Sequence, residues 1–420
     1  MINLISNFIN KFKRKIFPFY KNKELKLVFN ILQKDLPKEI VAARFVGGCV
    51  RKYLTGEQID DIDIATILTT DEVKQKFKNT NFKVIETGVE HGTVTLLSND
   101  HKLEVTTLRK DIKSDGRHAK VEFTDNWLLD SERRDFTINA IYMNIDGKIF
   151  DPQNGKTDLK NKNVKFIGDP NKRIEEDYLR IIRFLRFKIM YNMDVENSTS
   201  NAIKENLDGI KKISKERVLL ELLKILDLKN FTNINDNNYL KEIFSLIFPE
   251  FLYLNRLGRL KKVREDSKLN RYILLAILLI DEKDNHEYFA HKYNVSKNMQ
   301  NNLNEISSNL KKIKYDKNFL DKNLDRNIYI FGKSHLIALN LINFTKNSKI
   351  KFNEFSRNIR RILKFSMPTF RIDGEYLKRN GMKEGETLGK VLKIIEEEWI
   401  KNSFKISENR IREIIKLNSN

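Results

Sequence analysis

Residues 45–66, which read FVGGCVRKYLTGEQIDDIDIAT, constrain the fold of this chain more than any other stretch. A short apolar strand leads into Gly47 and Gly48, and the segment after this glycine pair reads as a helix that ends in a turn. The next strand carries Asp61 and Asp63, so both carboxylates should lie on one face of a sheet. Such a pair repels itself unless a cation lies between the two groups, and glycines before a helix let a phosphate approach the backbone. The stretch therefore predicts a metal site that faces a phosphate site.

The charge of the chain predicts a polyanionic partner. Lys and Arg number 78 against 57 Asp and Glu, which gives a net charge of +21. An excess of this size indicates nucleic acid or an anionic membrane surface, and we expect nucleic acid. The longest apolar run, residues 272–280, is far shorter than the roughly 20 residues of a membrane-spanning helix, so we expect a buried core helix there and no membrane association. The single cysteine, Cys49, excludes an intramolecular disulfide and fits a reducing compartment, so we expect a cytoplasmic protein.

Apolar periodicity separates a strand-rich head from a long helical remainder. The head should contain strands at 45–46, 62–65, 83–85, 93–97 and 103–106 and helices at about 24–36 and 71–77. Beyond Pro170 the pattern is helical, as in 173–187, 215–226, 238–247, 269–280 and 296–313. The chain is therefore α+β, and at 420 residues it should divide into several compact units. We expect a basic leader (1–24), a catalytic head (25–165), a helical neck (166–235), a helical body (236–345) and a helical tail (346–420).

Two further motifs carry charge in the head. LEVTTLRKD, residues 103–111, is a strand on which Glu104 is either an ordinary solvated residue or a third carboxylate beside the aspartate pair. SERRDFTINAIYMN, residues 131–144, places Arg133 and Arg134 at what reads as the start of a helix. Their planar, permanently charged groups suit a triphosphate, although an arginine pair is more often a solvated face.

A last motif, EEDYLRIIRFLRF, repeats charge every third residue at Asp177, Arg180, Arg183 and Arg186. On one helix neighbours in this series lie side by side, and the simplest interpretation of the first two is a surface ion pair. An acceptor beside a donor is also a template for a nucleobase. Cytosine and adenine present an amino donor beside a ring-nitrogen acceptor, whereas uracil and guanine present a carbonyl beside an N–H. Such a template would accept C and A and reject U and G.

The motifs GGCVR and DID, then RRDFTINA, then EDYLRIIR, in this order, resemble the nucleotidyltransferase superfamily. Within it the resemblance is to the class II tRNA nucleotidyltransferases (CCA-adding enzymes) and the bacterial poly(A) polymerases. It implies a polymerase-β-like head with a mixed sheet, Mg²⁺ as the cofactor, and addition of C, C and A from CTP and ATP to the 3′ end of tRNA. One position departs from the family pattern, since Lys52 stands where an acidic residue is usual.

The resemblance also implies a role for each motif residue. Asp61 and Asp63 are the expected metal ligands, and Glu104 is the expected third catalytic carboxylate. The expected nucleotide-binding residues are Gly47, Gly48, Arg51, Arg134, Asp177, Arg180, Arg183 and Arg186. Asp135 and Asn139 are expected to organise the ribose pocket or the local fold.

Three other segments are compared with the family. Residues 113–127 look like its flexible loop, which favours addition of A as well as C. KERVLLELLKIL, residues 215–226, reads as neck scaffold rather than chemistry, and the basic clusters at 259–264 and 311–317 read either as solvated faces or as surfaces along tRNA.

Three alternative functions stay open. A bacterial poly(A) polymerase shares the catalytic motifs, a non-catalytic RNA-binding protein would account for the net charge, and a small-molecule nucleotidyltransferase would share the head. The intact aspartate pair argues against the second alternative, and the long basic helical remainder argues against the third. Nothing in the sequence predicts the oligomeric state.

Overall fold

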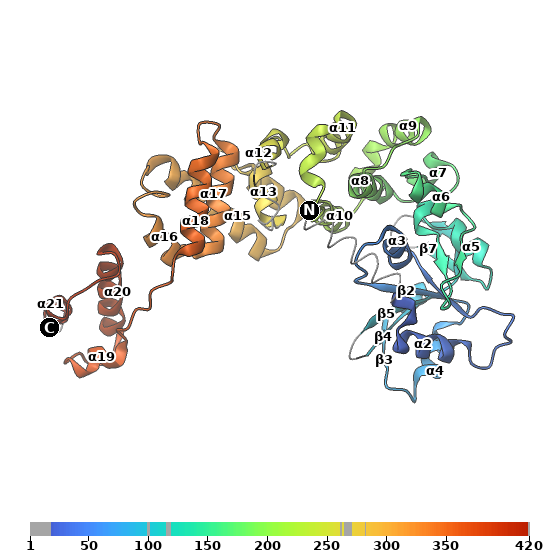
Figure 1. The fold of residues 1–420 in the computed structure, drawn as a ribbon, viewed down its shortest axis with the longest axis horizontal. Coiled ribbons are helices and arrows are strands. Elements are labelled where there is room, and N and C mark those ends of the chain that lie inside the picture. The colour runs from blue at the N-terminus through green and yellow to red at the C-terminus, as the bar shows by residue number, and fades with distance from the viewer. Residues whose placement is uncertain are drawn as a thin grey trace. The chain divides into compact units, whose positions relative to one another are not determined.

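The computed structural model describes residues 18–98, 101–114, 119–260, 263, 271–281 and 283–418. Within them the chain forms two compact units: residues up to 234 together with 238–247, and residues 235–237 together with those from 248 onward. Figure 1 shows the strands in the N-terminal part of the chain and helices in the rest. The predicted α+β class, with a mixed-sheet head followed by helices, is confirmed. The finer boundaries of leader, neck, body and tail stay predictions.

The described part of the head contains a sheet of seven strands in the order β3-β4-β5-β2-β1-β8-β9. The strands are β1 (Ala43–Val46), β2 (Ile62–Thr66), β3 (Lys83–Gly88), β4 (Thr93–Leu97), β5 (Lys102–Thr107), β8 (Tyr142–Met143) and β9 (Ile149–Phe150). β2 and β5 run parallel, and the other neighbours are antiparallel. The parallel pair aligns Asp63 with Glu104, so these two side chains lie on the same face of the sheet. The five strands predicted from the sequence are all present.

The expected loop at 113–127 is wrong over 113–114 and 119–123, which are strands, whereas 124–126 are irregular. The described residues form a hairpin of β6 (Arg109–Ser114) and β7 (Ala119–Phe123), a separate two-stranded sheet. Arg109 pairs with Phe123 and Asp111 with Val121, so the backbone groups of this polar stretch are satisfied by cross-strand bonds. The centre of the expected loop, 115–118, lies outside the described residues, as does most of the basic leader.

Helices cover the sheet and continue the first unit. They are α2 (Lys23–Gln33), α3 (Gly48–Thr55), α4 (Thr70–Phe77), α5 (Trp127–Glu132), α6 (Gly155–Lys160), α7 (Pro170–Glu176), α8 (Leu179–Tyr191), α9 (Asn197–Glu205), α10 (Lys215–Leu226) and α11 (Asn238–Ile247). α2 begins inside the segment predicted as the leader, because the side chain of Asn22 caps it by accepting hydrogen bonds from Glu24 N and Leu25 N.

The single helix predicted over 173–187 is wrong, because the chain breaks between α7 and α8. Asp177 has an extended backbone, with φ −156° and ψ 103°, and its Oδ1 accepts a hydrogen bond from Leu179 N at 3.2 Å. Aspartate competes with helical hydrogen bonds in this way and is therefore favoured at helix starts. The break removes Asp177 from the helix that carries Arg180, so the two residues are not helical neighbours.

Aromatic side chains join the head to α8. Phe136, which follows the arginine pair, lies with its ring centroid 4.7 Å from that of Phe166 and 5.5 Å from that of Phe187. Phe166 stacks on Phe184 at 6.3 Å, and all four rings are fully buried. Rings of this size contribute much of the burial energy of a core, so they fix α8 against the segment that carries RRD.

The second unit is helical throughout its described residues. Its helices are α12 (Leu257–Leu260), α13 (Arg271–Leu279), α14 (Asn285–Tyr293), α15 (Lys297–Tyr315), α16 (Leu324–Phe331), α17 (Lys333–Lys346), α18 (Phe352–Lys364), α19 (Gly374–Arg379), α20 (Glu386–Lys401) and α21 (Glu408–Leu417). α13 is the predicted core helix, since residues 274–279 are all buried. None of the helices among the described residues has the length and apolar character that crossing a bilayer requires.

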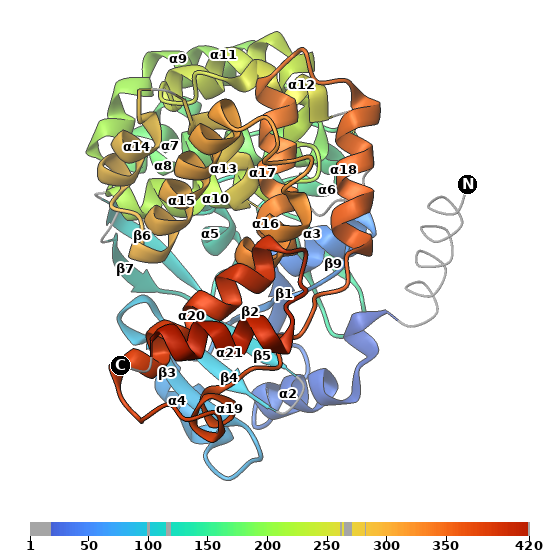
Figure 2. The same cartoon turned by 90° about the vertical axis from the view of Figure 1, so that its left-hand side faces the viewer.

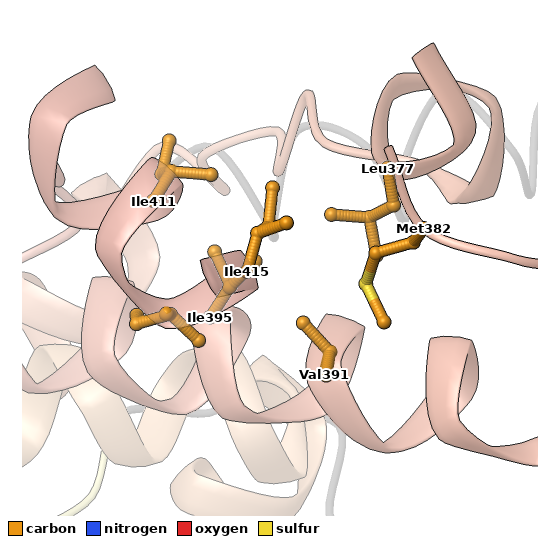
Figure 3. Close-up of a cluster of buried hydrophobic side chains, with 7 residues drawn as sticks. Leu377, Met382, Val391, Ile395, Ile411 and Ile415 are labelled. Carbon is orange, nitrogen blue, oxygen red and sulfur yellow. The ribbon is translucent and has the colours of Figure 1, made fainter. Parts of the chain in front are cut away.

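The C-terminal helices have a small core of their own. α20 and α21 lie side by side, with α19 against α20 (Figure 2). Between them lie the buried side chains of Leu377, Met382, Val391, Ile395, Ile411, Ile414 and Ile415 (Figure 3). Trp399 and Phe404 lie with ring centroids 5.0 Å apart, and Trp399 also packs on Tyr329 of α16. This part of the chain therefore has both a core and an attachment to the rest of the second unit.

Candidate active site

One cavity in the first unit gathers most of the predicted site residues. Its volume is about 470 Å³, within the usual range for a small-molecule site. Its walls come from the β1–α3 turn, α3, β2, the β6–β7 hairpin, the segment after α5, the break before α8, α8 itself and α10. Nine of the eleven predicted residues line it: Gly47, Gly48, Arg51, Asp63, Arg134, Asp177, Arg180, Arg183 and Arg186. The two exceptions are Asp61 and Glu104.

The lining is strongly basic. It includes eight arginines, namely Arg51, Arg109, Arg133, Arg134, Arg180, Arg183, Arg186 and Arg217, against four aspartates, Asp63, Asp111, Asp135 and Asp177. Guanidinium groups stay charged at all accessible pH values and bind phosphate in two-point contacts. A cavity with this excess of positive charge suits a polyphosphate.

The glycine pair brings the N-terminus of α3 close to Asp63 of β2. Gly47 directly precedes the first residue of α3. Its φ is 70°, a backbone conformation that residues with a side chain rarely adopt. A Cβ built on Gly47 would lie 3.8 Å from Asp63 Oδ2, so the turn and the carboxylate are in close proximity. Cys49 is fully buried behind this turn, and burial raises the pKa of its thiol to about 11. The thiol therefore stays protonated, which agrees with a packing role.

Asp63 carries the electrostatic signature of a cation site. Its pKa is raised from 3.8 to about 6, chiefly by burial and also by the charges of Glu104 and Asp61, while Arg134 and Arg51 oppose the shift. Three carboxylates thus repel one another around a partly buried position. A hard divalent cation would relieve both the burial cost and the repulsion, and carboxylate oxygens are its preferred ligands. The donor set therefore fits the divalent cation expected from the sequence.

The three carboxylates are nevertheless not assembled into a closed ligand cage. Asp61 lies one residue before β2 and is exposed, rather than within the strand as predicted. Glu104 is half-exposed and lies 3.0 Å from Lys102 Nζ. In the described residues no three His, Cys, Asp or Glu side chains converge closely enough to hold a metal by themselves. Lys52, the departure from the family pattern, binds Asp60 at 2.9 Å and so ties α3 to the residue before Asp61.

The arginine pair follows a helix instead of starting one. α5 ends at Glu132, and both arginines reach back to the buried Asp130: Arg133 Nη2 lies 2.7 Å from its Oδ1, and Arg134 Nη2 lies 2.9 Å from its Oδ2. Cations are favoured at a helix C-terminus, which explains this placement. Burial by itself would raise the pKa of Asp130. The charges of the two arginines outweigh this effect and hold the pKa well below its usual range. Asp130 is thus a support of the site that the sequence analysis missed.

Arg51 joins three of the motifs. From α3 it donates hydrogen bonds to Asn139 Oδ1 and, at 3.0 Å, to Tyr191 OH. Its guanidinium lies 4.7 Å from the ring centroid of Phe187 in α8. Asp135 closes the group, because it accepts hydrogen bonds from Asn139 Nδ2 at 2.7 Å and from Arg183. Asp135 and Asn139 therefore organise the local fold around the cavity, as one of their two expected roles required.

The two predicted base-reading residues line the same cavity but do not bind each other. Asp177 Oδ2 lies 2.7 Å from Arg217 Nη2, whereas Arg180 Nη1 lies 2.6 Å from Glu176 Oε2. The predicted surface ion pair between Asp177 and Arg180 is therefore wrong, because the break before α8 gives each residue a different partner. Arg186 donates to Glu221 Oε2 of α10 at 2.8 Å.

Sequence reasoning missed three charged lining residues. Arg109 and Asp111 alternate on β6, and their i, i+2 spacing was the available signal for a shared face. Arg217 lies in the segment that was read as scaffold. Its place one turn before Glu221, with apolar residues on the opposite side, was the signal for a polar face on that helix.

Comparison with known proteins first defines the class. Residues 43–165 match the family described as the poly A polymerase head domain, and residues 192–253 match the probable RNA and SrmB-binding site of polymerase A. The mixed sheet, the glycine turn and the carboxylate strand together are those of a polymerase-β-like nucleotidyltransferase.

Relatives define the family within that class. The CCA tRNA nucleotidyltransferase 1, mitochondrial, of Mus musculus is 32% identical over 403 residues, which cover 90% of this chain and 87% of the relative. The CCA-adding enzyme of Ligilactobacillus salivarius (strain UCC118) is 33% identical over 389 residues, which cover 90% and 92%. The chain belongs to the family of CCA-adding enzymes, which are in general metal-dependent nucleotidyltransferases.

Solved structures agree on the fold. The Bacillus stearothermophilus CCA-adding enzyme in complex with CTP has a TM-score of 0.69 at 23% identity, with 94% of this chain and 98% of that chain covered. The Thermotoga maritima CCA-adding enzyme complexed with tRNA has a TM-score of 0.65 at 20% identity, with 96% and 98% covered. At this identity the likeness concerns the fold.

Proposed function

We propose that this chain adds C, C and A to the 3′ end of tRNA from CTP and ATP, with release of pyrophosphate. One observation carries the proposal: a single basic cavity holds Asp63 beside the glycine turn and, on another wall, Asp177 and Arg180. The first group suits phosphoryl transfer, and the second suits recognition of a base. The relatives named as CCA-adding enzymes, and the fold neighbours solved with CTP and with tRNA, support the choice of substrates.

Asp177 and Arg180 choose the base. Asp177 offers an acceptor to the amino group of cytosine or adenine, and Arg180 offers a donor to the adjacent ring nitrogen. Uracil and guanine would place a carbonyl against the carboxylate and an N–H against the guanidinium. A site that hydrogen-bonds cytosine or adenine would leave its own buried polar groups unpaired if uracil or guanine bound instead. Such a site discriminates strongly between the two pairs of bases.

Arginines and backbone groups hold the triphosphate. Gly47 and Gly48 let the phosphates approach the N-terminus of α3. Arg51 and Arg134 neutralise the charge that accumulates on the leaving pyrophosphate, and both are held rigid by hydrogen bonds at the cavity wall. Arg183 and Arg186, anchored by Asp135 and Glu221, keep α8 in register beside the nucleotide.

Asp61 and Asp63, with Glu104 assisting, are the residues that would hold Mg²⁺. Bound Mg²⁺ supplies a lowered pKa for the RNA 3′-hydroxyl and charge neutralisation for the in-line displacement at the α-phosphate. The chain's own contribution is to hold Asp63 in close proximity to the glycine turn. Burial and neighbouring carboxylates hold its pKa near 6, so the carboxylate is ionised above that pH.

A poly(A) polymerase is the second candidate, and the description of the matched head family favours it. Both activities use the same catalytic carboxylates and differ in where addition stops. A long A tail on a tRNA that already ends in CCA would support this candidate. We further propose a cytoplasmic location, with organellar import as the alternative that the relatives named as mitochondrial raise. Imaging of a C-terminally tagged chain separates the two.

The metal assignment is tested by replacing Asp63 with alanine. We expect loss of CTP incorporation with tRNA binding retained, measured by gel extension and by filter binding on the same preparation. Near-normal incorporation by the variant would show that the carboxylates have been assigned wrongly.

A further inference from the structure

We propose that Arg217 is a positioning residue for base selection, which holds the carboxylate of Asp177 toward the base of the incoming nucleotide. The inference rests on the proposed function and deepens it. Its starting point is one contact, in which Arg217 Nη2 of α10 lies 2.7 Å from Asp177 Oδ2, and both residues line the cavity. Arg217 comes from a helix 40 residues further along the chain than the residue it binds.

Asp177 needs an external support because its own backbone gives it little. It lies at the break between α7 and α8 in extended conformation, outside either helix. Two contacts fix its carboxylate: Oδ1 accepts a hydrogen bond from Leu179 N at 3.2 Å, and Oδ2 accepts one from Arg217. A carboxylate has about four acceptor positions, so these two contacts orient the group and leave acceptor capacity for a base.

The same contact also restrains a competing donor. Arg217 is a permanent cation whose N–H groups could donate to the carbonyl of uracil or guanine, the bases to be rejected. The N–H group on Nη2 that donates to Asp177 is not available to the carbonyl of a base. The pair therefore favours cytosine and adenine in two ways. It presents an acceptor to their amino group, and it occupies a donor that would otherwise bind the carbonyl of uracil or guanine.

α10 is built to hold this arrangement. Arg217 and Glu221 are four residues apart and so lie on one face of the helix. Glu221, whose side chain is 4% exposed, accepts a hydrogen bond from Arg186 of α8 at 2.8 Å. α10 therefore contacts this part of the chain at two points: the cation Arg217 binds Asp177, and the anion Glu221 binds Arg186 of α8. Arg180 is held separately, by Glu176 and by the carbonyl of Arg173, so Arg217 serves the acceptor half of the template.

The experiment compares CTP and UTP as substrates on a tRNA that lacks its 3′ end. We expect Arg217→Met to lower the ratio of kcat/KM for CTP to that for UTP by tenfold or more, because the acceptor is no longer oriented. Arg217→Lys keeps the charge without the planar fork and should recover part of the ratio. Lys215→Met is the matched control, since it removes an exposed cation from the same helix outside the cavity, and its ratio should stay within twofold of the wild type.

A double substitution separates positioning from scaffold. Asp177→Ala alone releases Arg217 and should raise UTP incorporation, whereas Asp177→Ala combined with Arg217→Met should lower it again because the released donor is gone. Equal losses for CTP and UTP in Arg217→Met, or unfolding of both Arg217 variants, would overturn the assignment in favour of a structural role. A wild-type chain that adds neither C nor A would overturn the proposed function itself, whereas an active wild type with an unchanged ratio in Arg217→Met would overturn only the role of Arg217.

Discussion

Replacing Asp63 with asparagine should stabilise the metal-free protein while abolishing its chemistry. The Asp63 carboxyl titrates near pH 6 in the folded chain, compared with 3.8 ordinarily, because it is buried and lies among other carboxylates. Each pKa unit corresponds to about 1.36 kcal/mol, so ionised Asp63 costs the fold about 3 kcal/mol above pH 6. Asparagine has a similar shape without the charge and should recover most of that energy.

The sign of the pH dependence makes the prediction specific. Below about pH 4 the carboxyl is protonated in the folded and the unfolded chain, so the variant and the wild type should be equally stable. Between pH 4 and 6 the unfolded chain ionises first, and the wild type should lose stability relative to the variant as pH rises. Above pH 6 the difference should be constant.

Tryptophan fluorescence can follow this difference in the first unit. Trp127 lies in the first unit and Trp399 in the second, so a Trp399→Phe background isolates the first. For a unit of this size about 3 kcal/mol corresponds to a rise of roughly 6–12 °C in the unfolding midpoint at pH 8. Added Mg²⁺ should raise the midpoint of the Asp63 chain and leave the asparagine variant unchanged. The control is Asp125→Asn, which changes an exposed carboxylate. A stability gain in Asp63→Asn that is equal at pH 4 and pH 8 would show that ionisation of Asp63 does not cause it.

Three further predictions follow from the division of labour in the first unit and from the packing of both units. Asp61→Ala should abolish incorporation of every nucleotide, whereas Asp177→Ala should mainly change which nucleotide is added. Single-nucleotide extension assays distinguish the two effects. If both variants lost total incorporation and nucleotide selectivity to the same extent, chemistry and base selection would not be divided between these two residues. Asp130→Asn should destabilise the first unit by about 3–5 kcal/mol in urea unfolding, because it leaves Arg133 and Arg134 beside a buried group that no longer carries charge. A change below about 1 kcal/mol would show that the charge of Asp130 does not hold the two arginines in place. Ile395→Ala should cost about 2–5 kcal/mol in the C-terminal cluster and lower the Trp399 transition while sparing that of Trp127.

Local patterns predicted the parts of the site that are built from local sequence. The glycine turn, Asp63 on its strand, and the alignment of Glu104 on the neighbouring strand all depend on periodicity and on turn chemistry within a few residues. Strands β1 to β5 and the helices α2, α3, α4, α10, α11, α13 and α15 were predicted for the same reason. A short stretch of sequence contains enough information to specify a strand, a turn or an amphipathic helix.

The parts that could not be predicted depend on partners far away in the chain. A charge at every third residue looks like one helix, and only the contact of Asp177 with Arg217 makes the break before α8 part of the site. The sequence around Arg133 and Arg134 predicts the start of a helix. In the structure both side chains instead bind Asp130 at the end of α5. The hairpin likewise needs its cross-strand pairs, since its sequence alone is polar enough to be read as a loop.

Stepwise nucleotide addition distinguishes CCA addition from the alternative activities of the proposed active site. A tRNA that lacks its 3′ end is incubated with the wild-type chain and each nucleoside triphosphate separately, then with CTP and ATP together, and the products are resolved at single-nucleotide length. We expect two C from CTP alone, one further A when ATP is present, and then a halt, with no addition from UTP or GTP. An extended A tail, or equal use of all four nucleotides, would contradict it.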